Sequence, residues 1–311
     1  MRAVIALGGN AMTGPDGTAT SEDQRLAVTA AMAAVADLVA DGAELVLTHG
    51  NGPQVGNLLV KNELAAHLVP PMPLDWCVAQ TQATIGMLML NALDLALAER
   101  RAVPRPAVVV TRTLVGRDDP GFAHPTKPIG RYLPEPQARR LAAHGEVWES
   151  RGQRGWRRMV ASPEPLEIMD APAVRTLLDA GFVVVCAGGG GVPVVRGADG
   201  ELRGVPAVID KDLAAAVLAR AVGAELLVIA TDVDQAVRDF GTPSATPIGR
   251  VTPSELRAIA AEGHFASGSM GPKVEATIRF VEEGGHRAAI TSLERIGAAA
   301  RGEAGTVVQR S

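Results

Sequence analysis

The chain has 311 residues, 47% of them hydrophobic and 21% charged, which is the balance of a soluble globular protein with a large buried core. Its formal net charge of −4 argues against nucleic acid or an anionic membrane as the main partner. No apolar stretch reaches about 18 residues without a charge or a helix breaker, so the sequence predicts no membrane-spanning segment. The apolar run that opens the chain is too short for the core of a signal peptide, and we expect a cytoplasmic protein.

Short apolar runs alternate with helical patterns along the chain. Strands buried on both faces are predicted at residues 3–7, 44–48, 107–113, 182–187, 226–231 and 288–291. Helices are predicted at residues 21–41, 81–101, 211–222, 252–262 and 271–283, the first with Ser21 as its N-cap. This alternation predicts an α/β protein with an open, mainly parallel sheet and helices on both of its faces.

Two segments depart from this alternation. Residues 115–165 are rich in Pro, Gly and Arg and contain few apolar runs, so we expect a small subdomain that protrudes over one sheet edge. Residues 192–206 predict a hairpin with its turn at residues 198–201. The sequence shows no internal repeat, and residues 1–311 are predicted to form a single domain around one continuous sheet.

The chain has two cysteines, Cys77 and Cys186, which lie far apart in the sequence. Because Cys186 ends an apolar run, a buried free thiol is favoured over a disulfide at this position.

Three glycine clusters directly follow predicted strands. They are Gly8-Gly9-Asn10, Gly50-Asn51-Gly52 and the run at residues 188–191. Ligands of open parallel sheets bind beyond the carboxyl ends of the strands, and glycine there lets backbone N–H groups approach an anion. A structural turn could explain any one cluster, whereas three at equivalent ends predict a phosphate or carboxylate site.

Several well-known site motifs are missing from the sequence. It contains neither a P-loop nor a serine-nucleophile elbow, and the glycine run at residues 188–191 leads into a strand rather than opening a helix, which disfavours dinucleotide binding. The six histidines show no metal-binding spacing and read as surface or hydrogen-bonding residues. One of them, His49, stands next to Gly50 in the second glycine cluster.

The lysines are more informative, because only four of the 30 basic residues are Lys. Lys127, Lys211 and Lys273 lie in motifs marked by proline, aspartate or glycine, whereas Lys61 lies on a predicted helix and reads as a surface residue. Lysine should persist where a compact ammonium on a flexible stem is needed. Each could also be an ordinary solvated side chain, but ammonium groups beside glycine N–H groups suit phosphoryl transfer.

Two carboxylates follow the predicted strand at residues 226–231. Asp232 and Asp234 come directly after Thr231. They could orient a nucleotide or water on Mg²⁺, or they could simply cap and turn the chain, and the sequence leaves both readings open.

These residues match the motifs of a known family in order along the chain. The matching segments are residues 6–11, 48–57, 125–130, 155–158, 188–193, 208–212 and 263–273. Together they resemble the carbamate kinases over essentially the whole chain. The resemblance implies the amino-acid-kinase fold, a three-layer αβα sandwich with a protruding subdomain at about residues 115–165. It also implies an acid-binding half at about residues 1–180, a nucleotide-binding half at about residues 181–311, and a homodimer.

The resemblance further implies the reaction ATP + carbamate ⇌ ADP + carbamoyl phosphate with Mg²⁺, running towards ATP in arginine or related nitrogen catabolism. Lys127 and Lys211 would stabilise the transferring phosphoryl group, Asp212 would position the lysines and Lys273 would hold ATP phosphate. Carbamate and phosphoryl oxygens would contact Gly8, Gly9, Asn10, Gly50, Asn51, Gly52, Gly189 and Gly190. The nucleotide would contact Asp210, Thr231, Asp232, Asp234, Phe240, Met270 and Lys273. We expect no protein metal site, because nucleotide phosphates would hold the Mg²⁺.

One position favours carbamate over other acids. Related acid kinases commonly place a lysine where this chain has Ala6, and Lys211 would supply the missing charge, as it does in carbamate kinases. Phe240 stands where the family often has Tyr, and this difference would change the contacts with adenine. The alternatives are a kinase of the same fold for another small acid, or a non-catalytic nucleotide sensor that would be expected to lack these lysines.

Overall fold

The computed structural model describes residues 1–8, 20–143, 145–265 and 269–311. Its main sheet has eight strands in the order β15-β17-β16-β12-β1-β2-β9-β3. Their bounds are β1 Arg2–Leu7, β2 Glu44–His49, β3 Arg105–Val108, β9 Phe182–Val185, β12 Leu226–Thr231, β15 Arg250–Val251, β16 Arg287–Ser292 and β17 Thr306–Gln309. From β16 to β3 all neighbours run parallel, and β17 runs antiparallel to β16.

Helices cover both faces of this sheet. Alternate residues of β1 enter different cores, since Val4 and Ala6 face one helix layer and Ile5 and Leu7 face the other. One layer contains α1 (Ser21–Ala40), α3 (Leu74–Glu99) and α9 (Ile296–Arg301). The other contains α5 (Ala171–Asp179), α6 (Lys211–Ala221), α7 (Pro253–Ala261) and α8 (Met270–Glu282). The predicted three-layer αβα sandwich is therefore confirmed.

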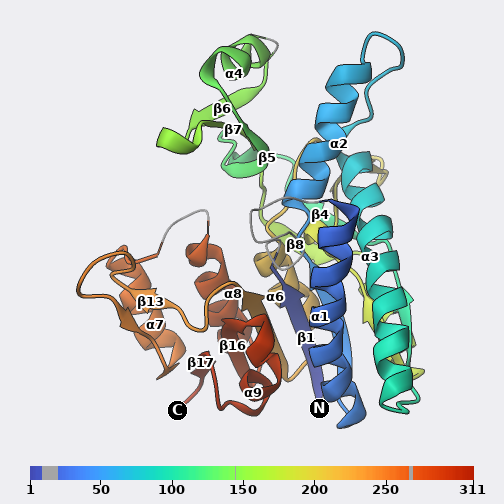
Figure 1. Cartoon of the computed structure of the whole chain (residues 1–311), viewed down its shortest axis with the longest axis vertical. Coiled ribbons are helices and arrows are strands. Elements are labelled where there is room, and N and C mark those ends of the chain that lie inside the picture. Colours follow the sequence, from blue (N-terminus) through green and yellow to red (C-terminus); the bar gives the residue numbers. More distant parts are fainter. Residues whose placement is uncertain (9–19, 144, 266–268) are drawn as a thin grey trace.

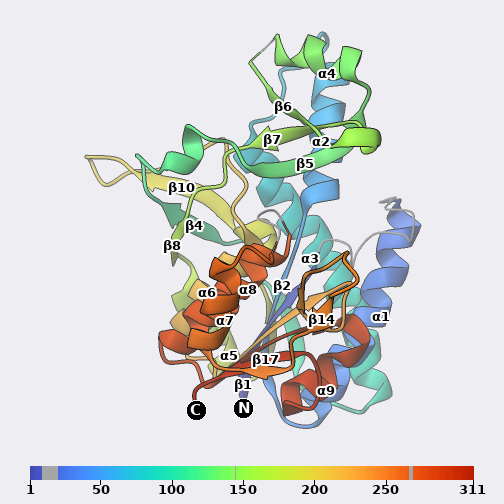
Figure 2. The same ribbon diagram turned by 90° about the vertical axis from the view of Figure 1, so that its left-hand side faces the viewer.

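A separate antiparallel sheet protrudes above the main one beside α2 (Gly52–Ala65), as Figures 1 and 2 show. Its elements fall within residues 115–165 and are β5 Lys127–Leu133, α4 Glu135–Ala142, β6 Val147–Ser150 and β7 Trp156–Val160. We call these four elements the subdomain.

Two smaller sheets and four short 3₁₀ turns complete the described chain. A four-stranded sheet contains β4 Arg112–Val115, β8 Pro165–Ile168, β10 Val192–Arg196 and β11 Leu202–Gly204, and a two-stranded sheet contains β13 Val237–Arg238 and β14 Thr246–Pro247. The 3₁₀ turns are η2 Pro120–Phe122, η3 Gly152–Arg154, η4 Gly188–Gly190 and η5 Leu293–Arg295. The predicted hairpin is confirmed, because β10 pairs antiparallel with β11.

The strand predicted at residues 107–113 is wrong as a single element. The chain leaves the main sheet after β3 and re-enters a different sheet at β4. Between them, the side-chain oxygen of Gln82 accepts a 3.0 Å hydrogen bond from the backbone N–H of Thr111. A side chain from α3 thus satisfies the backbone where strand pairing stops, a contact that the local apolar pattern could not reveal.

Helix starts also differ from the predictions. Thr20, not Ser21, caps α1, because its side chain accepts a hydrogen bond from the Asp23 N–H while the Asp23 carboxylate receives the Thr20 N–H. The helix predicted from residue 81 begins at Leu74, directly after Pro73. By length and a mean hydropathy of 1.2, α3 could cross a membrane, yet 44% of its most apolar stretch is buried inside this protein against neighbours that include α1 and β3.

Candidate active site

A cavity of about 210 Å³ lies beyond the carboxyl ends of β2 and β9, and residues of the subdomain line part of it. The loop after β2, strand β5, the loop after β9, and the N-terminal ends of α6 and α8 all contribute to its wall. The lining residues are Gly50, Asn51, Gly52, Pro53, Lys127, Pro128, Ile129, Arg157, Gly189, Val208, Ile209, Asp210, Lys211, Asp212, Ser269 and Lys273. Segments far apart in the sequence therefore meet at the place predicted for an anion.

Three of the four lysines reach this cavity, whereas Lys61 is exposed on α2. Lys127, from β5, donates to the Asp210 carboxylate at 2.5 Å. The other oxygen of Asp210 caps α6 by accepting from the backbone N–H of Asp212 at 2.9 Å. Burial would raise the pKa of Asp210, but the charge and hydrogen bond of Lys127, with the charge of Lys211 and the Asp212 N–H, together hold that pKa well below its usual range. Asp210 is thus a fixed anion that ties the subdomain to α6.

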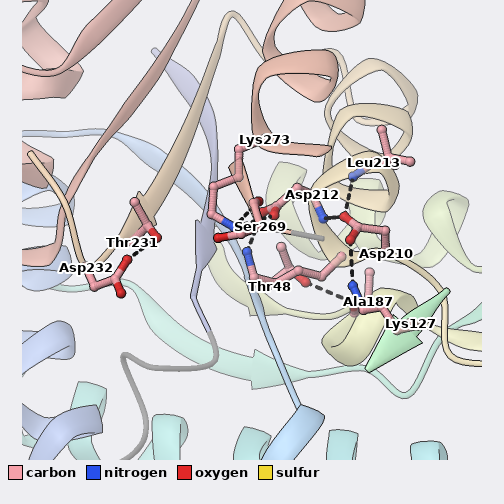
Figure 3. A network of polar contacts seen from close by, with 11 residues as sticks. Thr48, Lys127, Ala187, Asp210, Asp212, Leu213, Thr231, Asp232, Ser269 and Lys273 are labelled. Atoms are coloured by element: carbon pink, nitrogen blue, oxygen red, sulfur yellow. Dashed lines mark hydrogen bonds and ion pairs between the residues drawn. The ribbon is translucent and has the colours of Figure 1, made fainter. Parts of the chain in front are cut away.

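Asp212 joins the other two lysines, as Figure 3 shows in part. Its carboxylate contacts the ammonium of Lys211 and accepts from that of Lys273 at 3.0 Å. Lys211 is only 7% exposed, and burial lowers its pKa despite the neighbouring Asp212. Burial also acts to lower the pKa of Lys273, but the charge and hydrogen bond of Asp212, together with the charges of Asp210 and Asp232, outweigh burial and the pKa is raised. One carboxylate therefore holds a buried ammonium group, that of Lys211, and a partly buried one, that of Lys273, in place.

The glycine run forms a cradle against Asn51. Gly189 has φ +64°, and a Cβ there would overlap the Asn51 amide, so only glycine fits this close approach. The Asn51 amide donates at 2.9 Å to the hydroxyl of Thr81 on α3. Gly190 is buried beside Ile209, and its carbonyl accepts from Thr113 at 2.7 Å.

Buried threonines and a glutamine fix the start of this cradle at Ala187, which has φ +51°. The Ala187 carbonyl accepts from Thr48 at 2.8 Å, and its N–H donates to Thr111 at 2.8 Å. Gln82 bonds the backbone N–H and carbonyl of Thr111, both at 3.0 Å. The sequence analysis missed Gln82, Thr81 and Thr111. For Thr81 and Gln82 the available signal was the presence of polar side chains on a largely apolar helix.

His49 is 1% exposed, and its ring Nδ1 lies 2.9 Å from the Gly50 carbonyl. Since a carbonyl can only accept, Nδ1 carries the proton in the neutral ring. Burial, opposed by the Gly50 carbonyl and aided by the charge of Lys211, lowers the pKa of His49 to about 4. His49 is thus a neutral, buried support of the Gly50 loop.

Not every predicted residue lines the cavity. The Gly8 N–H donates to the Ala230 carbonyl at 2.8 Å, and Gly9 and Asn10 lie outside the described residues. Thr231 donates to the Asp232 carboxylate at 3.0 Å, and the charge of Asp232 contributes to the raised pKa of Lys273.

Three further residues predicted for the nucleotide have other surroundings. The Asp234 carboxylate accepts from Ser292 at 2.6 Å and lies 3.3 Å from Arg295. Phe240 is 73% exposed, and Met270 packs against the core at the start of α8. Their part in nucleotide binding stays a prediction.

The free thiols are confirmed, because Cys77 and Cys186 are both unpaired and buried. Among the residues that the structure describes, no group of three or more His, Cys, Asp or Glu side chains could hold a metal ion.

The αβα sandwich and its lysine-lined anion cavity define a phosphoryl-transfer enzyme of one fold family. The model of the amino acid kinase family matches residues 1–292, so the chain belongs to that family. Individual relatives narrow the assignment within this family. The chain is 46% identical to a carbamate kinase of Thermococcus kodakarensis, with 99% of both chains covered. It is 45% identical to a carbamate kinase-like protein of Escherichia coli, with 97% of both covered.

A solved structure agrees with these relatives. The carbamate kinase of Giardia lamblia bound to AMP-PNP is 39% identical, with a TM-score of 0.92 over all of this chain and 98% of the other. Within the amino acid kinase family, the chain therefore groups with the carbamate kinases, as its motifs predicted.

Proposed function

We propose that the protein catalyses reversible phosphoryl transfer between ATP and carbamate, giving ADP and carbamoyl phosphate. One observation carries the proposal: Lys127, Lys211 and Lys273 converge on a single cavity, held there by Asp210 and Asp212. A non-catalytic nucleotide sensor would not need three positioned ammonium groups. The Thermococcus kodakarensis and Giardia lamblia proteins named above are carbamate kinases, which supports the proposal.

The lysines act by electrostatic stabilisation. Negative charge spreads over the oxygens of the moving phosphoryl group, and preorganised cations stabilise it without reorganising during the reaction. Lys127 approaches from the subdomain, and Lys211 and Lys273 approach from α6 and α8. Asp212 positions the latter two, because it contacts both ammonium groups. Lys211 would neutralise the phosphoryl group and Lys273 the nucleotide phosphate.

The acid needs orientation rather than deprotonation. Carbamate is already an anion, so no general base is required, and the neutral ring of His49 is tied to the Gly50 carbonyl. Gly50, Asn51, Gly52 and Gly189 line the cavity and would hold carbamate and phosphoryl oxygens. Of the other predicted anion contacts, Gly8 and Gly190 belong to the proposal on sequence grounds, as do Gly9 and Asn10.

The nucleotide would enter from the side of β12. Asp232 follows that strand and acts electrostatically on Lys273, so we place ATP phosphates beside Lys273 and the base near the loop after Thr231. The two carboxylates on the cavity already pair with lysines, which fits an Mg²⁺ ion that nucleotide phosphates hold. Bound in that way, Mg²⁺ would neutralise charge on the β- and γ-phosphates.

Three further proposals follow from the family. We infer a cytoplasmic enzyme that makes ATP in arginine or related nitrogen catabolism. We also infer a homodimer, which is supported by the exposed apolar side chains of Trp76, Met87 and Leu95 on α3. Light scattering on the eluting peak of a size-exclusion column measures the mass, and a monomer at micromolar concentration would contradict the dimer.

The test is ATP formation from carbamoyl phosphate, ADP and Mg²⁺. We expect Lys211→Ala to reduce the rate at least about a hundredfold, since one buried charge at the transferring group is lost. Lys61→Ala removes an equal charge from the exposed face of α2 and serves as the matched control, with unchanged activity expected. A folded wild-type protein that binds ADP but makes no ATP would refute carbamate as the substrate.

A second candidate is a kinase for another small acid on the same site. It is favoured by the Escherichia coli relative, which is described only as carbamate kinase-like at 45% identity. Acetyl phosphate and other acyl phosphates, offered with ADP in the same assay, distinguish the two candidates.

A further inference from the structure

Arg157 reaches the cavity from a different wall than the lysines of α6 and α8. It lies on β7 of the subdomain and lines the same cavity as Lys127 and Pro53. Its neighbour Arg158 lines a separate pocket against α2. Successive side chains of a strand point to opposite faces, so Arg157 and Arg158 are directed to different surroundings by their place in the strand alone.

The two arginines differ in their partners. Arg158 pairs with Glu146 at 2.9 Å and with Glu63 at 3.4 Å. In the described chain no carboxylate pairs with Arg157, and its buried Nε has no hydrogen-bond partner. Glu149 stands directly opposite Arg157 on β6.

The carboxylate of Glu149, however, pairs with Arg151 at 3.2 Å instead. An unneutralised guanidinium is therefore left at the cavity wall. Its carbon lies over the ring of Tyr132, 5.2 Å from the centroid. Such stacking fixes the plane of the guanidinium, and Arg157 also donates a hydrogen bond to the Tyr132 side chain. A guanidinium has five N–H donors, so this contact leaves others for a ligand.

The charges of the cavity also point to an anion at this wall. Among the described residues it is lined by four cations and only two carboxylates, Asp210 and Asp212, both already engaged by lysines. One excess positive charge belongs to the Lys211–Lys273 pair, and the other belongs to Arg157. Carbamoyl phosphate is a dianion near neutral pH, so its charge matches this excess.

The position of Arg157 in the cavity indicates which end of the substrate it contacts. Lys273 lies on the α8 side of the cavity, where Asp232 acts on it. Arg157 comes from the subdomain, together with Lys127, towards the N-terminus of α2. During transfer the phosphoryl group must lie between the nucleotide and the acid. Because we place the nucleotide phosphates on the α8 side, the acid must lie on the side of the subdomain, next to Arg157.

We infer that Arg157 binds the acid end of the substrate and recognises the planar carboxylate of carbamate, an inference that rests on the proposed function. A guanidinium presents paired N–H donors that match a carboxylate, which an ammonium cannot do. In the direction that makes ATP, the oxygen between carbon and phosphorus gains negative charge as its bond to phosphorus breaks. Arg157 stabilises that charge, and the phosphoryl group passes to ADP.

The experiment compares Arg157→Gln, Arg157→Lys and Arg140→Gln in the full-length protein. Arg140, on α4 of the same subdomain, is exposed and supplies the control for loss of one positive charge. In Arg157→Gln we expect kcat/KM for carbamoyl phosphate to fall about 10- to 100-fold, the range of one charged hydrogen bond, while KM for ADP changes little. Arg157→Lys, which keeps the charge and tests the inference even if Arg157→Gln does not fold, should fall between wild type and Arg157→Gln.

In the kinetic assay, two results would overturn the inference: wild-type kinetics in Arg157→Gln, or an equal rise in KM for both substrates. If the wild type makes no ATP from carbamoyl phosphate, the proposed function fails, and the inference is then tested with bicarbonate, a planar anion similar in size to carbamate. Thermal stabilisation by bicarbonate that is lost in Arg157→Gln and kept in Arg140→Gln supports the role of Arg157. Equal stabilisation of all variants overturns it.

Discussion

The contact between Gly56 on α2 and Gly130 on β5 decides how closely the subdomain docks. A methyl group built on Gly56 would lie 2.0 Å from the Cα of Gly130, which is backbone and cannot rotate away. To restore ordinary contact at 3.4 Å, α2 and β5 would have to separate by roughly 1.4 Å. Gly56→Ala is therefore a small change that tests the docking of the subdomain.

The displacement reaches the cavity directly. Lys127 lies on the same strand as Gly130, and its 2.5 Å contact with Asp210 cannot survive a shift of that size without rearrangement. Misplacing a catalytic group by about 1 Å can cost on the order of a hundredfold in rate. We therefore expect kcat of Gly56→Ala to fall between about 10- and 100-fold, with overpacking reducing stability by about 1–3 kcal/mol.

The assay is ATP formation from carbamoyl phosphate, with thermal unfolding measured in parallel. Gly249→Ala is the control, because a Cβ there would meet nothing within 4 Å and its φ is not in the left-handed region. In a helix without steric overlap, replacing glycine by alanine raises stability by about 1 kcal/mol. A loss of stability in Gly56→Ala would therefore show that the overlap with Gly130 outweighs the gain in helix propensity. A Gly56→Ala variant that is more stable than wild type with unchanged kcat would refute the reasoning.

Three further predictions concern buried polar groups. Since burial lowers the pKa of His49 from 6.5 to about 4, the unfolded chain binds the proton first, and stability is lost as the pH falls through this window. His49→Asn should therefore reduce the stability difference between pH 7 and pH 4.5, measured by urea unfolding, by about 2 kcal/mol, and an unchanged difference would contradict the assignment. Burial raises the pKa values of Cys77 and Cys186, so both thiols should react with dithionitrobenzoate only after unfolding; rapid reaction of the native protein would show that they are accessible. Gln82→Leu removes the hydrogen-bond partner of the Thr111 backbone N–H, whereas the Thr111 carbonyl keeps its 2.9 Å hydrogen bond from the Val192 N–H. The variant should destabilise the protein by about 1–3 kcal/mol and lower kcat, which thermal unfolding and the same ATP assay test. Thr84→Val, at an exposed position of the same helix, is the control.

Local chemistry was enough to predict the architecture. The buried strands, the alternation with helices and the glycine-rich strand ends can be predicted from neighbours within a few residues. The three site lysines, Lys127, Lys211 and Lys273, could also be singled out from the sequence, because lysine is rare in this arginine-rich chain. Local rules failed where a distant side chain decided the outcome. The strand predicted at residues 107–113 breaks because Gln82, on α3, satisfies the backbone at Thr111.

Only the tertiary structure decided which chemistry-bearing residues meet. Lys127 and Asp210 are 83 residues apart, yet they form one ion pair because the subdomain folds over the N-terminus of α6. Arg157 and Arg158 are adjacent, yet only Arg157 faces the cavity, because a strand turns successive side chains to opposite sides. The sequence by itself determined the elements and the residue types, since periodicity is a property of short segments. Strand order and subdomain docking set the convergence of the site, and these depend on contacts between residues that the sequence keeps far apart.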